Sequence, residues 1–315
     1  MEETIALSIF STIIVLYFCG LLFGTFTVGI WICFALSILF GIYAVMLLIK
    51  ERGGVKYCLT PGTVVFLVFF LYVWWLNRGR RFSIWDEFSH WGLVVKNMYI
   101  FDYFGNHPDS TVTFRGYPPA TALWQYFVAK ICGEFKEEYA YQAMGWLMSS
   151  LLLPVLKKFN WKRMISACFS VSILAMIPLV FNYLYPVSLL VDIILGLLLG
   201  YLLVSSYYEE KRDCFSILNA SFAIMVLCLT KASGAFLGAV YVVIVIIYDI
   251  IAHKKIKEKE ILVSWGIHVL ALLIGKFSWS IYLNISSTNP AWQTSSLNLA
   301  NIMNLLKEER NISIL

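Results

Sequence analysis

The sequence predicts an all-α protein, a polytopic bundle of transmembrane helices with one long polar segment outside the bilayer. The chain has 315 residues, 60% of them hydrophobic, and a mean hydropathy of +0.77. Its apolar residues form uncharged runs of about twenty residues, the length at which a helix crosses a bilayer. Lys and Arg gather between these runs, and aromatic residues gather near their ends, as is typical of helical membrane proteins.

Nine such runs follow one another along the chain. They cover residues 5–26, 28–49, 64–76, 138–156, 165–181, 187–204, 215–229, 235–251 and 261–283. If each run crosses once, every strongly basic short connection falls on one side, which the positive-inside rule assigns to the cytoplasm. Because the positive charge lies at span ends, the net charge of +5 does not indicate nucleic-acid binding. We therefore expect about nine spans in an integral plasma-membrane protein.

The whole chain, 1–315, is expected to form a single membrane domain. Residues 1–60 form an N-terminal helical hairpin with its inner loop, 77–137 a long extracytoplasmic segment, and 284–315 an outer C-terminal segment. Two helices lying on the membrane surface are expected within the long segment. In the first, the apolar positions recur at helical spacing: Phe88, Trp91, Val94, Val95, Met98 and Phe101, opposite Asp86, His90, Lys96 and Asn97. The second begins at Tyr117-Pro118-Pro119 and carries Ala120, Leu123, Trp124, Phe127 and Ile131 on one face.

Asp86 and Glu87 are the first candidates for chemistry. They lie in the stretch Trp85-Asp86-Glu87-Phe88-Ser89-His90-Trp91, directly after a predicted span. Acidic residues favour helix N-termini, so one interpretation is a solvated pair that caps the following helix. The other is a general base with a partner that positions an acceptor, a metal or a phosphate, since a partly desolvated carboxylate is a better base near neutral pH.

Three further motifs accompany this acidic pair in a fixed order. Tyr117-Pro118-Pro119 opens the second surface helix, Tyr185-Pro-Val-Ser-Leu-Leu-Val-Asp192 leads into a span, and Leu229-Thr230-Lys231 forms an outer turn. Their order, spacing and sidedness resemble the GT-C superfamily of integral-membrane glycosyltransferases, in particular the bacterial relatives of protein mannosyltransferases and aminoarabinose transferases. The resemblance covers most of the chain. Relatives commonly run longer, so the chain is expected to be a minimal or a truncated member.

The resemblance implies transfer of a sugar from a polyprenyl-phosphate donor to an extracytoplasmic envelope polymer, glycolipid or protein, with inversion. By position Asp86 would be the base and Glu87 its partner. Arg115, beside Tyr117, and Lys231 would contact the donor phosphate. Asp192 would lie near the active cavity, and the alternative is a structural pair with Lys231. Lys231 could also be a snorkelling interfacial lysine, and Arg115 a solvated charge.

His90 lies one helical turn after Asp86, so the two can share a face. A hydrogen-bonding or acceptor-contact role fits it better than metal coordination, because Asp86, Glu87 and His90 supply too few fixed ligands. The sequence requires no metal and leaves a divalent cation open. Lys276, within the last run, could face the cavity or snorkel. Two other functions stay open: a transporter or flippase of lipid-linked saccharides, and a non-catalytic membrane assembly subunit.

Overall fold

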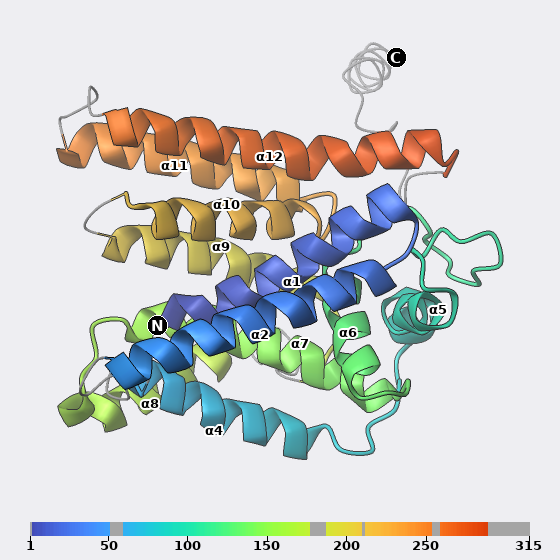
Figure 1. The fold of residues 1–315 in the computed structure, drawn as a ribbon, viewed down its shortest axis with the longest axis horizontal. Helices are drawn as coiled ribbons and strands as arrows, with labels where there is room; N and C mark the ends of the chain where they lie inside the picture. The colour runs from blue at the N-terminus through green and yellow to red at the C-terminus, as the bar shows by residue number, and fades with distance from the viewer. Residues whose placement is uncertain (1, 51–58, 177–186, 210–211, 254–258, 289–315) are drawn as a thin grey trace, which may run out of the picture.

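The computed structural model describes residues 2–50, 59–176, 187–209, 212–253 and 259–288, and these residues fold into helices without any strand (Figure 1). The α-helices are α1 (Glu2–Phe23), α2 (Thr27–Lys50), α4 (Pro61–Leu76), α5 (Leu93–Phe101), α6 (Ala120–Ile131), α7 (Glu137–Leu152), α8 (Met164–Met176), α9 (Val191–Tyr208), α10 (Cys214–Cys228), α11 (Gly234–His253) and α12 (Lys259–Ile285). A π-helical turn, Glu87–Trp91, precedes α5, and 3₁₀ turns follow α7 (Leu153–Leu156) and precede α8 (Trp161–Arg163).

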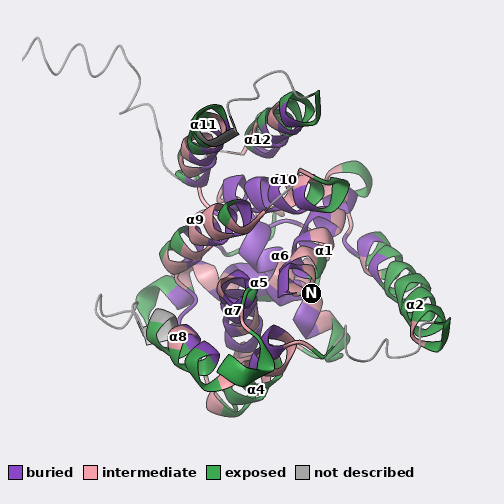
Figure 2. Ribbon diagram, turned by 90° about the vertical axis from the view of Figure 1, so that its left-hand side faces the viewer, coloured by how far each residue is buried: buried purple, intermediate pink, exposed green. Residues whose placement is uncertain are grey.

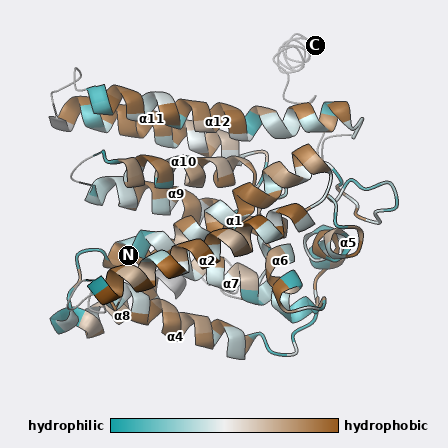
Figure 3. Cartoon of the chain, viewed as in Figure 1, coloured by the Kyte–Doolittle hydropathy of each residue, from teal (hydrophilic) through white to brown (hydrophobic). Residues whose placement is uncertain are grey.

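Five of these helices are long and apolar enough to cross a membrane: α1, α2, α9, α11 and α12. Two shorter apolar helices, α4 and α10, accompany them. Each of the nine predicted runs falls on a helix, but α4, α7, α8 and α10 have at most 16 residues within the described parts of the chain. Figure 3 shows hydrophobic residues along the helices and hydrophilic residues mainly in the connections between them.

α1 and α2 pack against each other as the predicted hairpin, and α1 is the central helix of the bundle. In the most apolar 18-residue stretch of α1, 50% of the residues are buried. The corresponding share in α2, which turns back alongside α1, is 6%. α1 packs against α6, α7 and α10, and Phe10, Ile13, Leu16 and Tyr17 lie fully inside the core. Figure 2 shows the consequence: α1 lies among the other helices, whereas α2 lies at the rim with most of its surface exposed. The two halves of the predicted N-terminal hairpin therefore play different roles.

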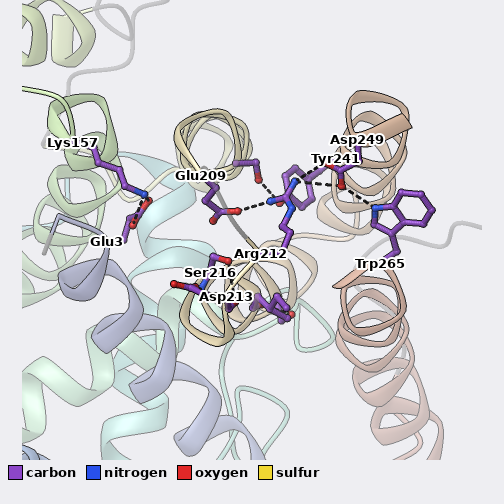
Figure 4. A network of polar contacts seen from close by, with 12 residues as sticks. Glu3, Lys157, Glu209, Arg212, Asp213, Ser216, Tyr241, Asp249 and Trp265 are labelled. Atoms are coloured by element: carbon purple, nitrogen blue, oxygen red, sulfur yellow. Dashed lines mark hydrogen bonds and ion pairs between the residues drawn. The ribbon is translucent and has the colours of Figure 1, made fainter. Parts of the chain in front are cut away.

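Polar contacts tie the helix ends together at what we call the basic end of the bundle, where α1 begins (Figure 4). Lys157 forms an ion pair with the buried Glu3 at 3.1 Å. Arg212 pairs with Glu209 and, at 3.1 Å, with Asp249, which also accepts a hydrogen bond from Trp265. Burial, opposed by Arg212, raises the pKa of Glu209 to about 7. The basic stretches at 51–58, 210–211 and 254–258 lie outside the described residues.

The opposite end of the bundle, the loop end, holds residues 77–136. There the turn between α1 and α2 meets Asp102, which accepts hydrogen bonds from Thr25, Thr27 and Tyr126. Burial alone would raise the pKa of Asp102, but these hydrogen bonds outweigh it and hold the pKa below its usual value. Asp102 thus joins α1, α2, α5 and α6, a structural role that its position in a polar stretch did not reveal.

The first helix of this segment differs from its prediction in phase. The N–H of Gly92 donates to the carbonyl of Glu87, five residues earlier, at 2.9 Å. This π-helical turn contains one extra residue, which rotates the preceding side chains by about 100° relative to an α-helix. As a result Glu87 and His90 are buried and Phe88 is 55% exposed. Asn97 is buried as well, so the predicted polar face is wrong for His90 and Asn97.

The second predicted surface helix, α6, is enclosed by protein on several sides. It packs against α1, α5 and α7, so that Leu123, Tyr126 and Ala129 are all buried. Trp124 donates a hydrogen bond to the carbonyl of Ala143 on α7 at 2.8 Å. The predicted start at Pro119 is confirmed to within one residue, because Pro119 is the N-cap of α6. Of the predicted apolar stripe, only Ile131 is largely exposed.

Candidate functional site

A cavity of about 430 Å³ opens at the loop end, between the start of α6, the turn from α10 to α11, and α12. Two lysines, Lys231 and Lys276, line it together with the aromatic rings of Tyr117 and Trp279. The remaining lining residues are small, apolar or uncharged: Gly116, Pro118, Cys228, Ala232, Ser233, Gly275, Ser280, Leu283 and Asn284. Two cations among aromatic and apolar groups suit an anionic group attached to an apolar molecule.

Backbone hydrogen bonds hold the two motif segments side by side. The N–H of Ala120 donates to the carbonyl of Leu229 at 2.8 Å, which docks the Tyr-Pro-Pro segment onto the end of α10. From the other side, the indole N–H of Trp279 on α12 donates to the carbonyl of Gly116 at 3.0 Å. Segments 110 residues apart in the sequence thus meet at one wall of the cavity, and Tyr117 and Lys231 line it together.

The two lysines differ in their partners. Lys231 forms an ion pair with Asp192 at 2.7 Å, the structural pair that the sequence left as an alternative. The side chain of Asp192 is 52% exposed, so water screens this pair and its contribution to stability is small. Lys276 makes no ion pair with any described residue. It is exposed and lines the cavity, one of the two positions that its place within a predicted span allowed.

Aromatic contacts connect the π-helical turn to the cavity wall. The ring of His90 lies 4.6 Å from that of Tyr117, and Phe114 and Trp91 complete the cluster. Asp86 immediately precedes the π-helical turn and is exposed. It is not among the lining residues, and its carboxylate makes no hydrogen bond or ion pair with any residue that the structure describes. The structure therefore does not bring Asp86 into the cavity wall with Tyr117 and Lys231.

His90 is a buried, neutral histidine. It is only 3% exposed, its Nδ1 has no hydrogen-bond partner within the described chain, and burial lowers its pKa to about 3. An unfolded histidine binds a proton below about pH 6.5, so between these two values the unfolded state binds more protons. Its burial therefore makes the fold less stable as the pH falls.

We expect this histidine to cost about 2 kcal/mol of unfolding free energy between pH 7 and pH 5. His90→Phe keeps an aromatic ring against Tyr117 and removes the titrating group. Unfolding of the purified protein at the two pH values should therefore show a smaller loss for the variant than for the wild type. Equal losses in both proteins would contradict the assignment of a low pKa to His90.

Glu87 is held by the protein itself. Its carboxylate is 2% exposed and accepts hydrogen bonds from the hydroxyl of Tyr141 at 2.6 Å and from the N–H of Ser83 at 2.8 Å. These contacts fasten the chain before the π-helical turn to α7. This position gives Glu87 a structural task and holds Asp86, its neighbour, on the outside.

Arg115 also binds its own segment. Its guanidinium donates to the carbonyls of Ser110 and Pro108, which closes the polar loop before α6. It does not line the cavity. Of the predicted site residues, the structure thus joins Tyr117, Lys231 and Asp192 directly, and His90 through Tyr117. It adds Lys276 and Trp279, and only Lys276 had a sequence signal, a charge inside an apolar run.

No family model, curated protein or solved structure matches this chain.

Proposed function

We propose that this protein is a membrane glycosyltransferase that takes a sugar from a polyprenyl-phosphate donor and transfers it, with inversion, to a cell-envelope acceptor. The observation that carries the proposal is the cavity in which Lys231 and Lys276 lie among aromatic and apolar groups. The apolar helix α12 borders this cavity, so an isoprenoid tail can stay in the bilayer while its phosphate meets the lysines. The proposal places the cavity at the extracytoplasmic face of about nine spans.

In this proposal the two lysines offset the charge that develops on the departing phosphate. Fixed cations aimed at a developing negative charge lower the barrier most where water is partly excluded. Lys231 is oriented by Asp192, and the buried Trp279 fastens α12 to the segment before α6. Tyr117 and Trp279 supply ring faces and polar edges of the kind on which sugars stack and hydrogen-bond.

Asp86 serves as the general base. Inversion requires the base on the face of the sugar opposite the leaving group. The support for this role is that the exposed Asp86 precedes the turn whose His90 ring packs on Tyr117, a residue of the cavity wall. An acceptor hydroxyl between Asp86 and the donor sugar would be deprotonated as it attacks.

Substitution of the lysines tests the donor site. We expect Lys231→Gln and Lys276→Gln each to lower kcat/KM for a labelled polyprenyl-phosphate sugar about tenfold, since a hydrogen bond to a charged group contributes about 1.5–3 kcal/mol. The double variant should lose about 100-fold. Initial rates in reconstituted membranes measure the effect, and Lys162→Gln, an exposed lysine at the basic end, is the charge-matched control.

The variant Asp192→Asn tests whether Lys231 acts on the donor phosphate or only through its ion pair with Asp192. If Lys231 acts only through its pair with Asp192, then Asp192→Asn and Lys231→Gln will have equal effects. The proposal expects Asp192→Asn to cost less, because Lys231 keeps its charge beside the donor. Full transfer by the Lys231→Gln/Lys276→Gln double variant would refute the donor site.

A further inference from the structure

A second basic cavity lies at the loop end, and it shares no residue with the first. It has a volume of about 720 Å³ and opens between the segment after α4, the helix α5 and the start of α7. Four cations line it, from three different segments of the chain: Arg80, Arg81, Lys96 and Lys136. The other lining residues are Gly79, Tyr99, Ile100, Phe135, Glu137 and Glu138.

The two carboxylates of this cavity are already engaged with the backbone. Glu137 accepts a hydrogen bond from the N–H of Phe82 at 2.6 Å, and Glu138 accepts one from the N–H of Gly79. These bonds fasten the segment after α4 to the start of α7. The carboxylates therefore shape the cavity, and neither forms an ion pair with one of its four cations.

Lys136 already has an anionic partner, because it forms an ion pair with Glu134 at 2.6 Å, but other cations of the cavity have none in the described part of the chain. Among the described residues, the side chains of Arg81 and Lys96 make no hydrogen bond and no ion pair. Nε of Arg80 is buried without a hydrogen-bond partner in the same part of the chain, although its guanidinium packs over the ring of Tyr141. Arg81 and Lys96 are exposed cations that line the cavity, so both are free to meet an anion there.

Exposed aromatic residues flank the basic segment that lines this cavity. Trp74 and Trp75 at the end of α4 are 44% and 63% exposed, and Trp85 and Phe88 beyond the basic segment are 68% and 55% exposed. Large exposed aromatic side chains beside Lys and Arg are typical of the membrane–water interface. Ile100, which lines the cavity, is exposed as well and extends this apolar rim.

We propose that this cavity binds the phosphate-bearing headgroup of an anionic membrane lipid. The phosphate meets Arg80, Arg81 and Lys96, and the acyl chains leave over Ile100 and the exposed aromatic residues into the bilayer. The site is separate from the proposed donor cavity, and lipid binding there does not require that the protein transfers a sugar.

Titration of the purified full-length chain in neutral detergent tests this inference. The probes are short-chain phosphatidylglycerol, short-chain phosphatidylcholine and inorganic phosphate, followed by calorimetry. We expect phosphatidylglycerol to bind and phosphatidylcholine not to. The Arg81→Gln/Lys96→Gln double variant should weaken binding about 25-fold, or about fivefold for each cation removed near an anionic lipid. Both side chains are exposed, so an unchanged thermal midpoint will show that the variant folds.

Arg78→Gln is the matched control, because Arg78 lies in the same segment, packs over Trp74 and does not line the cavity. It should keep the wild-type affinity. Equal weakening by Arg78→Gln would mean that a diffuse positive field attracts the lipid, and would overturn the site. Equal binding of phosphatidylcholine, or binding of inorganic phosphate as tightly as the lipid, would overturn it too, because the headgroup charge or the lipid would then be dispensable.

Discussion

Asp86→Asn is expected to lower the rate of sugar transfer by about 10²- to 10⁴-fold, the usual contribution of a positioned general base. The amide cannot accept the acceptor proton but has the same size as the carboxylate. The exchange should leave the fold intact, because Asp86 is exposed and has no hydrogen-bonding partner among the described residues. Asn is also as good as Asp at the residue preceding a helix. The measurement is the initial rate with a labelled polyprenyl-phosphate sugar in reconstituted membranes.

Asp109→Asn is the control for this prediction. Asp109 belongs to the same polar segment and its side chain is 79% exposed, beside His107, so the substitution removes the same charge away from the π-helical turn. Its rate should stay at the wild-type value. Undiminished transfer by Asp86→Asn would sink the assignment of the base. An equal loss in both variants would point to the net charge of the segment instead.

Gly234→Ala is expected to destabilise the turn that carries Lys231, costing about 3 kcal/mol of unfolding free energy as an overpacked site. A Cβ at Gly234 would lie 1.9 Å from the carbonyl oxygen of Leu227, and this backbone atom cannot rotate away. The turn between them carries Lys231, whose carbonyl accepts a hydrogen bond from the N–H of Gly234 at 2.8 Å. The methyl group must therefore open the turn and displace Lys231.

Gly200→Ala in α9 is the matched control, because nothing lies within 4 Å of its Cβ position. Removing a glycine from a helix interior should raise stability slightly, by up to about 1 kcal/mol. Thermal unfolding of both variants gives the comparison, and the donor KM reports the position of Lys231. A wild-type midpoint and KM for Gly234→Ala would show that the turn tolerates a side chain and would contradict this packing.

The helices themselves followed from local sequence. A long apolar run in a bilayer must form a helix, because every backbone polar group has to find its hydrogen-bond partner within the segment. This applies to the runs that form α1, α2, α9, α11 and α12. Local sequence did not show which helix lies at the centre of the bundle and which lies at its rim. α1 and α2 are about equally apolar, yet one is the centre of the bundle and the other lies at its rim. Hydropathy measures affinity for an apolar surrounding and does not distinguish protein from lipid.

At the candidate site, single residues were easier to identify than their partners. Lys231, Asp192 and Lys276 stood out because a charge near an apolar run is costly and needs a reason. Which of them pair was decided by the fold, which joined Lys231 to Asp192 and left Lys276 facing the cavity. His90 was placed on the wrong side of its helix by one π-helical residue. The spacing of hydrophobic residues does not reveal a π-helical turn, so the helix face could not be predicted correctly.

The sequence alone determined that this chain is helical, strongly apolar and divided between a basic end and a polar loop end, because these properties depend on composition and on neighbours within one helix. Tertiary structure decided that Tyr117 and Lys231 share a cavity, that Arg80, Arg81 and Lys96 share another, and that Glu87 supports the turn beside Asp86. Those arrangements depend on contacts between segments far apart in the sequence, such as Ala120 with Leu229 and Gly116 with Trp279. The spacing of residues within one helix does not predict such contacts.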